Sequence, residues 1–143
     1  QTASSPDGKG VYLAMEQALE RANLKKEQID YINAHGTGTP NNDLSESIAM
    51  KRLFEDNVPP VSSTKSFTGH TTSASGSIEV VICLLAMQNQ FFPANLNWKN
   101  QMEEGITPVS GDIKAKMPIK HVLCNSFGFG GNDSSLVLTN PNI

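Results

Sequence analysis

The segment 75–90 places the strongest constraint on the fold. Its residues from Ile78 to Met87 are apolar on nearly every side of a helix, and Glu79 is the exception. The longest uninterrupted apolar run, 80–87, has eight residues, which is well short of the ~18 that cross a membrane. A helix that is apolar all round is a buried helix. We therefore predict a helix over 75–90 that is enclosed between other layers of the protein.

Alternating helices and strands are predicted around this segment. Residues 1–10 have the composition of a loop, and 11–24 have the period of an amphipathic helix. The remaining predicted elements are a strand at 29–34, a helix from about Asn42 or Asp43 to Phe54, a strand at 61–63, a polar loop at 64–72, an irregular stretch at 92–108, and strands at 121–126 and 135–139. Glu46 follows Asp43 by three residues, which resembles a capping box. This alternation favours a layered α/β domain.

Composition excludes several classes of protein. The 143 residues carry a net charge of −3, and no cluster of basic residues exceeds two, which argues against a nucleic-acid partner. Two cysteines and three scattered histidines give neither a disulfide framework nor a zinc-ligand spacing. We expect Cys83 and Cys124 to be buried small hydrophobes, and a cytoplasmic location. Because residue 1 is Gln, we also expect the chain to begin inside a longer protein.

Three glycine-containing loops each follow a short predicted strand. They are 33–40 (NAHGTGTP), 63–70 (STKSFTGH) and 125–131 (NSFGFGG). In open α/β sheets the carboxyl ends of the strands carry the functional site. We therefore expect the three loops to converge.

Each loop taken alone admits two interpretations. His35 either contacts a ligand or only caps a turn. Lys65 near His70 either keeps the imidazole neutral or is a solvated residue in a segment that caps a helix. Phe127 and Phe129 alternate with glycines, which indicates either mobile side chains or a tight hairpin with core aromatics.

Together and in this order, the three loops resemble the C-terminal half of a β-ketoacyl-acyl-carrier-protein synthase. The resemblance extends to the elongating enzymes of fatty-acid synthesis and to the ketosynthase domains of polyketide synthesis. It implies a thiolase-like fold, layered α-β-α-β-α, in which two similar halves share a layer of buried helices. Residues 1–143 would form one half, with the helix at 75–90 in the shared layer. The half with the nucleophilic cysteine would be absent, so the isolated chain would be inactive.

The resemblance also implies an acyltransferase that performs a decarboxylating Claisen condensation. Two histidines, His35 and His70, would form the oxyanion hole, and Lys65 would orient the site. Glu79 would be a buried structural acid, and a buried carboxylate needs a partner, either Lys65 or a bound monovalent cation. The substrate-binding residues would be Thr37 and Thr39 on the phosphopantetheine arm, with Phe127, Gly128 and Phe129 in the gate to the acyl pocket.

The implied partners are an acyl carrier protein, which holds the substrates on its phosphopantetheine, the N-terminal half of the protein, and a second copy in a homodimer. No metal, bound cofactor or membrane span is implied. Ser73, Ser75 and the pair Asn132–Asp133 depart from the usual family residues, which leaves substrate choice open. Two alternatives stay open: a non-catalytic subunit resembling a chain-length factor, and a thiolase or initiating synthase, in which Asn125 would be of interest.

Overall fold

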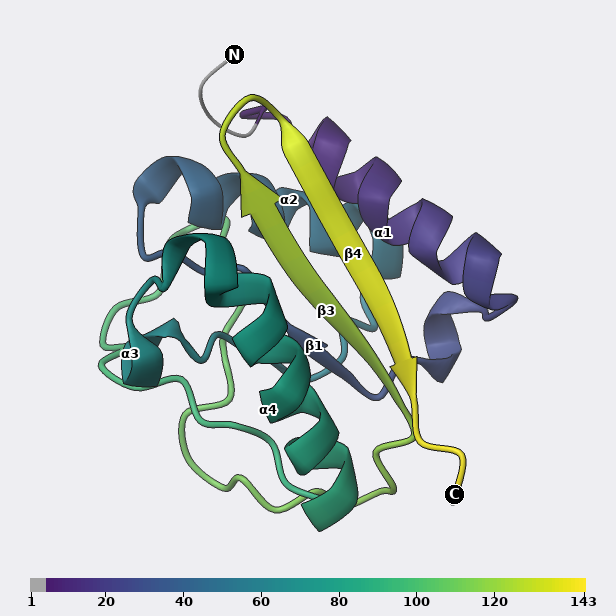
Figure 1. Ribbon diagram of the computed structural model, residues 1–143. Coiled ribbons are helices and arrows are strands. Elements are labelled where there is room, and N and C mark those ends of the chain that lie inside the picture. Colours follow the sequence, from purple (N-terminus) through teal and green to yellow (C-terminus); the bar gives the residue numbers. More distant parts are fainter. Residues whose placement is uncertain (1–4) are drawn as a thin grey trace.

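The computed structural model describes residues 5–143, and the first four residues of the predicted N-terminal loop lie outside this range. Figure 1 shows the elements in chain order. The helices are α1 (Lys9–Ala22), α2 (Pro40–Phe54), α3 (Lys65–Thr68) and α4 (Ser75–Asn89), with 3₁₀ turns η1 (Lys26–Gln28) and η2 (Thr72–Ala74). The strands are β1 (Tyr31–Asn33), β2 (Val61–Ser62), β3 (His121–Gly128) and β4 (Asn132–Thr139).

The four strands form one mixed sheet in the order β2-β1-β3-β4. Strand β1 pairs in parallel with both β2 and β3, whereas β3 and β4 form an antiparallel hairpin. Helices α1 and α2 pack on one face of the sheet and α4 packs on the other (Figure 1). The predicted α/β class is therefore confirmed, and the described chain has three layers.

Alternation along the strands builds two cores, because successive side chains of a strand point to opposite faces. Ile32 and Leu123 join the core beneath α1 and α2. Tyr31, Val122 and Cys124 join the core beneath α4. The two cores share the sheet, so the carboxyl ends of its central strands are held from both sides.

Both cysteines are buried in the core beneath α4, as predicted. A hydrogen bond to the Cys124 thiol is the main cause that raises the pKa of the Cys83 thiol, and burial raises it further. A reactive cysteine needs the opposite environment, one that lowers its pKa and exposes the sulfur. Neither thiol is placed to act as a nucleophile.

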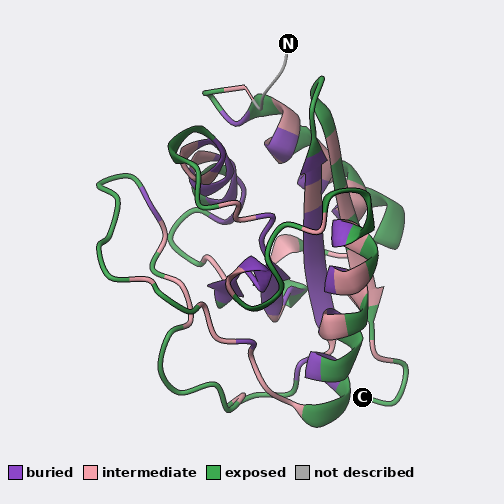
Figure 2. Ribbon diagram, turned by 60° about the vertical axis from the view of Figure 1, so that its left-hand side comes forward, coloured by how far each residue is buried: buried purple, intermediate pink, exposed green. Residues whose placement is uncertain are grey.

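Helix α4 differs from the prediction, because it is enclosed on only one side. Its inner face, including Glu79 and Cys83, lies against the sheet. Its outer face carries Val81, Leu84 and Leu85, which are 55%, 49% and 47% exposed. In Figure 2 the side of this helix that faces away from the sheet is largely coloured as exposed. The predicted burial on all sides is wrong because, among residues 5–143, the sheet alone covers α4 as a layer.

Several predicted boundaries and one cap are also corrected. The stretch 64–72, expected to be a loop, contains α3 and the start of η2. The predicted capping box is absent, because α2 begins at Pro40 and Glu46 turns its carboxylate toward the loop after β1. The final hairpin is longer than expected, and Gly130 and Gly131 make its turn with φ of 83° and 78°.

The irregular stretch at 92–108 is confirmed and contains no helix or strand. It leads along the edge of the sheet, where the Val109 N–H donates to the Val61 carbonyl at 2.8 Å. Within residues 5–143, no helix is long and apolar enough to span a membrane.

The core at β3 gives a direct test of this fold. Leu123 is fully buried, so we expect Leu123→Ala to lower the free energy of unfolding by about 2–5 kcal/mol. Leu13→Ala on α1, where the side chain is 39% exposed, is the matched control and should cost less than about 1 kcal/mol. Urea unfolding measures both, and equal losses would contradict the placement of β3 in the sheet centre.

Candidate functional site

The three loops converge as expected at the carboxyl ends of β1, β2 and β3. His35 follows β1, Lys65 begins α3 just after β2, and Phe127 lies near the end of β3. The rings of His35 and His70 meet edge to face, with centroids 5.3 Å apart. The centroid of the Phe127 ring also lies 5.3 Å from that of His35, with the two ring planes tilted by 60°. The neighbouring positions of β1, β2 and β3 in the sheet bring these distant segments together.

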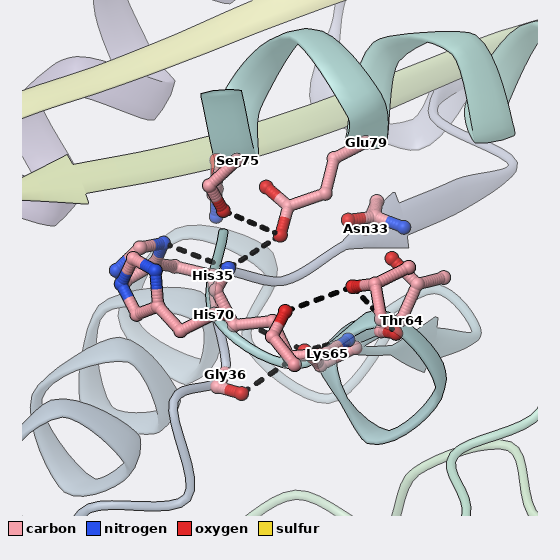
Figure 3. Close-up of polar contacts among 12 residues, drawn as sticks. Asn33, His35, Gly36, Thr64, Lys65, His70, Ser75 and Glu79 are labelled. Atoms are coloured by element: carbon pink, nitrogen blue, oxygen red, sulfur yellow. Dashed lines mark hydrogen bonds and ion pairs between the residues drawn. The ribbon is translucent and has the colours of Figure 1, made fainter. Parts of the chain in front are cut away.

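A buried ion pair lies behind the histidines (Figure 3). The ammonium of Lys65, whose residue is 8% exposed, donates to Oε1 of Glu79, which is 1% exposed. The Ser75 hydroxyl donates to the same oxygen at 3.2 Å. Lys65 is thus the partner that the buried Glu79 carboxylate was expected to need. Ser75, one of the departures from the usual family residues, adds a hydrogen bond to this pair.

The same ammonium determines the state of His35. Lys65 Nζ lies 3.2 Å from Nδ1 of His35. An ammonium can only donate, so Nδ1 accepts and the proton of the neutral imidazole lies on Nε2. Burial, the Lys65 charge and His70 lower the pKa of His35 to about 3. His35 is therefore neutral near pH 7.

The sequence suggested that Lys65 would act on its neighbour His70, and the structure differs. Strands β1 and β2 are adjacent and parallel, so the start of α3 faces the loop after β1 and the ammonium contacts His35. His70 is exposed, and its Nδ1 accepts the backbone N–H of Thr72 at 3.1 Å. Its neutral form also carries the proton on Nε2. With both Nδ1 atoms facing donors, the two rings present Nε2–H groups, which can donate to developing negative charge.

Glu46 is a site residue that the sequence analysis missed. Its carboxylate is buried and accepts the backbone N–H groups of His35 at 2.9 Å and Gly36 at 3.0 Å. It also accepts the side-chain amide of Asn125 at 3.1 Å. Burial raises the pKa of Glu46, and these three donors oppose that rise. The available signal was the position of Glu46 three residues before buried Ala49, on the apolar side of α2.

Asn125 has both ends of its amide engaged away from the histidine rings. Its nitrogen donates to Glu46, and its oxygen accepts the Ser135 hydroxyl at 2.7 Å. It is fully buried on β3. This arrangement makes Asn125 a structural link between β4, β3 and α2.

A cavity of about 550 Å³ opens beside the histidine pair. Its lining includes Thr37, Lys65, His70 and, from the irregular stretch, Trp98. The hydroxyls of Thr37 and Thr39 are 2.8 Å apart. Thr37 therefore lines the same cavity as Lys65 and His70.

The two phenylalanines of the third loop have different environments. Phe127 is 7% exposed and packs on His35, whereas Phe129 is 88% exposed at the hairpin tip. Gly128 lies between them and is exposed. The amide of Asn132, another departure from the usual family residues, donates to the Phe129 carbonyl at 3.1 Å, so it holds the backbone of the tip and not the Phe129 side chain.

Metal-binding potential is limited among the described residues. Residues 5–143 contain no group of three or more His, Cys, Asp or Glu side chains that could hold a metal ion. Three buried oxygens at the site, Asn33 Oδ1, Thr64 Oγ1 and Glu79 Oε2, have no hydrogen-bond partner among residues 5–143 (Figure 3). Oxygens of this kind suit a water molecule or a hard cation.

The family comparison agrees with this geometry. The family described as "Beta-ketoacyl synthase, C-terminal domain" matches residues 1–99, which is more than half of the chain. The chain belongs to the β-ketoacyl synthase family. The resemblance carried by the three loops is confirmed.

Curated relatives of this ketoacyl synthase domain are considerably longer than it is. The chain is 41% identical over 140 residues to 3-oxoacyl-[acyl-carrier-protein] synthase 2 of Vibrio harveyi, covering 95% of this chain and 34% of the relative. It is 41% identical over 139 residues to the chloroplastic synthase II of Arabidopsis thaliana, covering 95% of this chain and 26% of the relative. The chain therefore spans about a third or less of the length of these relatives.

Solved structures confirm the thiolase-like fold. A β-ketoacyl synthase from Burkholderia phymatum superposes with a TM-score of 0.88 at 32% identity, covering 98% of this chain and 35% of that one. A ketosynthase from Xenorhabdus doucetiae, solved in complex with its chain length factor, superposes with a TM-score of 0.78 at 39% identity, covering 96% and 35%. The described layers thus match one part of a larger ketosynthase.

The depressed pKa of His35 makes stability depend on pH. The ordinary pKa of 6.5 applies to the unfolded chain and about 3 to the folded one, so between these values only the unfolded state binds the proton. Stability from the neutral His35 is therefore present above pH 6.5 and is lost as pH falls toward 3, by roughly 1.4 kcal/mol per pH unit. The unfolding free energy of the unaltered protein should approach that of His35→Asn as pH falls from 6.5 to 4.5. A constant difference, measured by urea unfolding, would contradict a buried neutral His35.

Proposed function

We propose that this chain is the C-terminal part of a ketoacyl synthase and supplies the oxyanion hole for a decarboxylating Claisen condensation. The observation that carries the proposal is the pair of adjacent histidine rings, each with its Nδ1 facing a hydrogen-bond donor. Both are thereby restricted to the tautomer with a proton on Nε2. Fixed donors aimed at developing charge need no reorganisation during the reaction.

The chemistry requires such donors at one step. A malonyl thioester loses CO₂, and the electron pair of the broken C–C bond becomes an enolate with its charge on the thioester oxygen. His35 and His70 donate to that oxygen. The enolate carbon then attacks the acyl thioester on the nucleophilic cysteine, a C–C bond forms, and the cysteine leaves as thiolate. That cysteine belongs to the remainder of the protein, so the chain alone does not catalyse condensation.

The other predicted residues take supporting roles. Lys65 fixes the His35 tautomer, and Glu79 balances the buried ammonium charge. Thr37 and Thr39 hydrogen-bond the phosphopantetheine arm as it enters the cavity, and this arm brings the substrate without a cofactor bound to the chain. Phe129, flanked by Gly128 and Gly130, is the mobile part of the gate, while Phe127 is the fixed part against His35.

The partners follow from the same assignment. An acyl carrier protein delivers the thioesters, and the intact enzyme is a homodimer. One solved relative, 30% identical with a TM-score of 0.90, is a type II polyketide ketosynthase in complex with its acyl-carrier protein. The curated relatives named above are synthases that act on acyl-carrier-protein thioesters. Fatty-acid and polyketide pathways are both compatible with this set.

The remainder of the protein covers the outer face of α4. That face carries three half-exposed apolar side chains, Val81, Leu84 and Leu85. A hollow of about 640 Å³ lies beside it, between the start of α4 and the β3–β4 hairpin, with Val80 and Leu136 in its lining. The Vibrio harveyi relative is about three times as long as this chain. A protein of that length has enough further polypeptide to cover the outer face of α4 and to fill the hollow. Residues 1–143 are accordingly one half of a two-part domain.

A second candidate is a non-catalytic partner subunit. One solved relative pairs a ketosynthase with a chain length factor, so this family context includes such subunits. The positioned Lys65, His35 and His70 favour the enzyme, because a subunit that only shapes its partner's acyl tunnel has no need of two aligned imidazole donors. A cysteine at a helix start upstream of Gln1 favours the enzyme, and glutamine or another residue there favours the partner subunit. A thiolase-type His–Asn pair is disfavoured, because Asn125 is bound to Glu46 and Ser135.

Removing either donor tests the proposed function in the full-length protein. We expect His35→Ala and His70→Ala each to lower the rate of malonyl-carrier decarboxylation by ~10²–10³-fold, which is typical of a lost oxyanion-hole donor. His121→Gln is the matched control, because His121 lies at the start of β3 and hydrogen-bonds Thr139. Release of CO₂ from labelled malonyl-carrier is the measurement. Near-normal decarboxylation in either alanine variant would refute the donor pair.

The outer face of α4 can be tested on the chain alone. We expect the 143-residue chain to bind a hydrophobic dye or self-associate, because contiguous exposed apolar area does both. Leu84→Ser together with Leu85→Ser should reduce dye fluorescence, whereas Leu13→Ser, of similar exposure on α1, should not. A monodisperse monomer that binds no dye would contradict the two-part domain.

A further inference from the structure

We propose that Glu46 is a positioning residue that fixes His35 relative to Phe127 by binding the backbone on both sides of the site. This inference rests on the proposed function, because it concerns the geometry of the same donor. Glu46 touches no reacting atom in the proposed chemistry. It acts through the loop that carries His35.

The contacts of Glu46 join segments that are far apart in sequence. One oxygen, Oε1, accepts both the His35 N–H and the Asn125 amide, and the other, Oε2, accepts the Gly36 N–H. Asn125 lies on β3 two residues before Phe127, on the same face of that strand. The carboxylate therefore connects the loop after β1 directly to the strand that carries Phe127.

Glu46 binds the N–H groups of the His35 loop, whereas the Ser63 hydroxyl binds its carbonyl side by donating to the Gly36 oxygen at 3.0 Å. Gly36 and Gly38 have φ of 44° and 76°, so the backbone after His35 is in the left-handed region that glycine adopts readily. His35 and Phe127 are in ring contact at 5.3 Å, and Lys65 Nζ is 3.2 Å from His35 Nδ1. Both contacts depend on where the His35 backbone lies, and Glu46 holds that backbone at two successive N–H groups.

A carboxylate suits this position better than an amide would. Three donors converge on Glu46, and an ionised carboxylate has only acceptors. In Glu46→Gln the side-chain NH₂ must face either the Gly36 N–H or the His35 and Asn125 donors. The variant keeps the shape of the side chain and loses at least one anchor of the loop. Its effect therefore reports on anchoring and not on packing.

The experiment compares Glu46→Gln with Ser45→Ala in the full-length protein. Ser45 is the preceding residue of α2, is also buried, and donates its hydroxyl to the Ser5 carbonyl at 2.8 Å, away from the His35 loop. We expect Glu46→Gln to lower kcat for malonyl-carrier decarboxylation roughly 10- to 100-fold, since small misplacements of a catalytic group cost rates of this size. KM should stay within about twofold, because substrate binding is not altered. Ser45→Ala should lose stability without this loss of kcat.

Asn125→Ala is the second variant and is decisive if Glu46→Gln does not fold. It keeps both backbone contacts of Glu46 and removes the link to β3, so kcat should fall by a smaller factor than in Glu46→Gln, again with unchanged KM. An unchanged kcat in either folded variant would overturn the proposal. A fall in kcat in Ser45→Ala as large as that in Glu46→Gln and Asn125→Ala would also overturn it.

A structural readout separates this inference from the proposed function. If the unaltered full-length protein shows no decarboxylation, the proposed function fails, and the positioning role is judged on a crystal structure of Glu46→Gln or, where that variant does not fold, of Asn125→Ala. Displacement of His35 from its 3.2 Å contact with Lys65 Nζ and its 5.3 Å contact with Phe127 supports the role. Retention of both distances overturns it.

Discussion

The buried ion pair between Lys65 and Glu79 is the interaction on which the site depends. The charge of a lysine that is only 8% exposed must be paired, because an isolated buried charge is strongly unfavourable. Glu79 supplies the counter-charge from α4, and Ser75 supports it with a further hydrogen bond. The ammonium then has a donor left for His35, and this donor selects the imidazole tautomer. The tautomer of His35 thus follows from an ion pair anchored on α4, while burial is the main cause of its lowered pKa and the Lys65 charge adds to it.

Sheet topology explains how so few elements assemble such a site. Parallel pairing of β1 with β2 and β3 brings three carboxyl ends to one edge, and each loop leaves the sheet at that edge. Glu46 from α2 and Glu79 from α4 approach from opposite faces. Glu46 anchors the backbone of the loop that carries His35. Glu79 holds the Lys65 ammonium beside the imidazole of His35. His35 is consequently fixed from both layers of helices.

The predictable part of the molecule was the part carried by local pattern. The helices near 11–24 and 75–90, the central strands and the convergence of three glycine-containing loops all follow from periodicity and turn residues. The interpretation of Glu46 as part of a capping box was wrong, because spacing alone does not show which way a side chain turns. The burial of α4 on all sides was wrong for a related reason: hydropathy shows that a surface avoids water and does not show what covers it.

Residue types at short spacings were enough to predict the family, the α/β class and the loop residues that gather at the site, but not the part that Glu46 takes in it. The tertiary structure sets which of these residues touch. It paired Lys65 with His35 and not with His70, and it assigned both histidines the Nε2–H tautomer. It also turned Glu46 toward the His35 loop. The Lys65–His35 and Asn125–Glu46 contacts are about 3 Å long and join residues 30 and 79 positions apart, and such distances are set by strand order and packing.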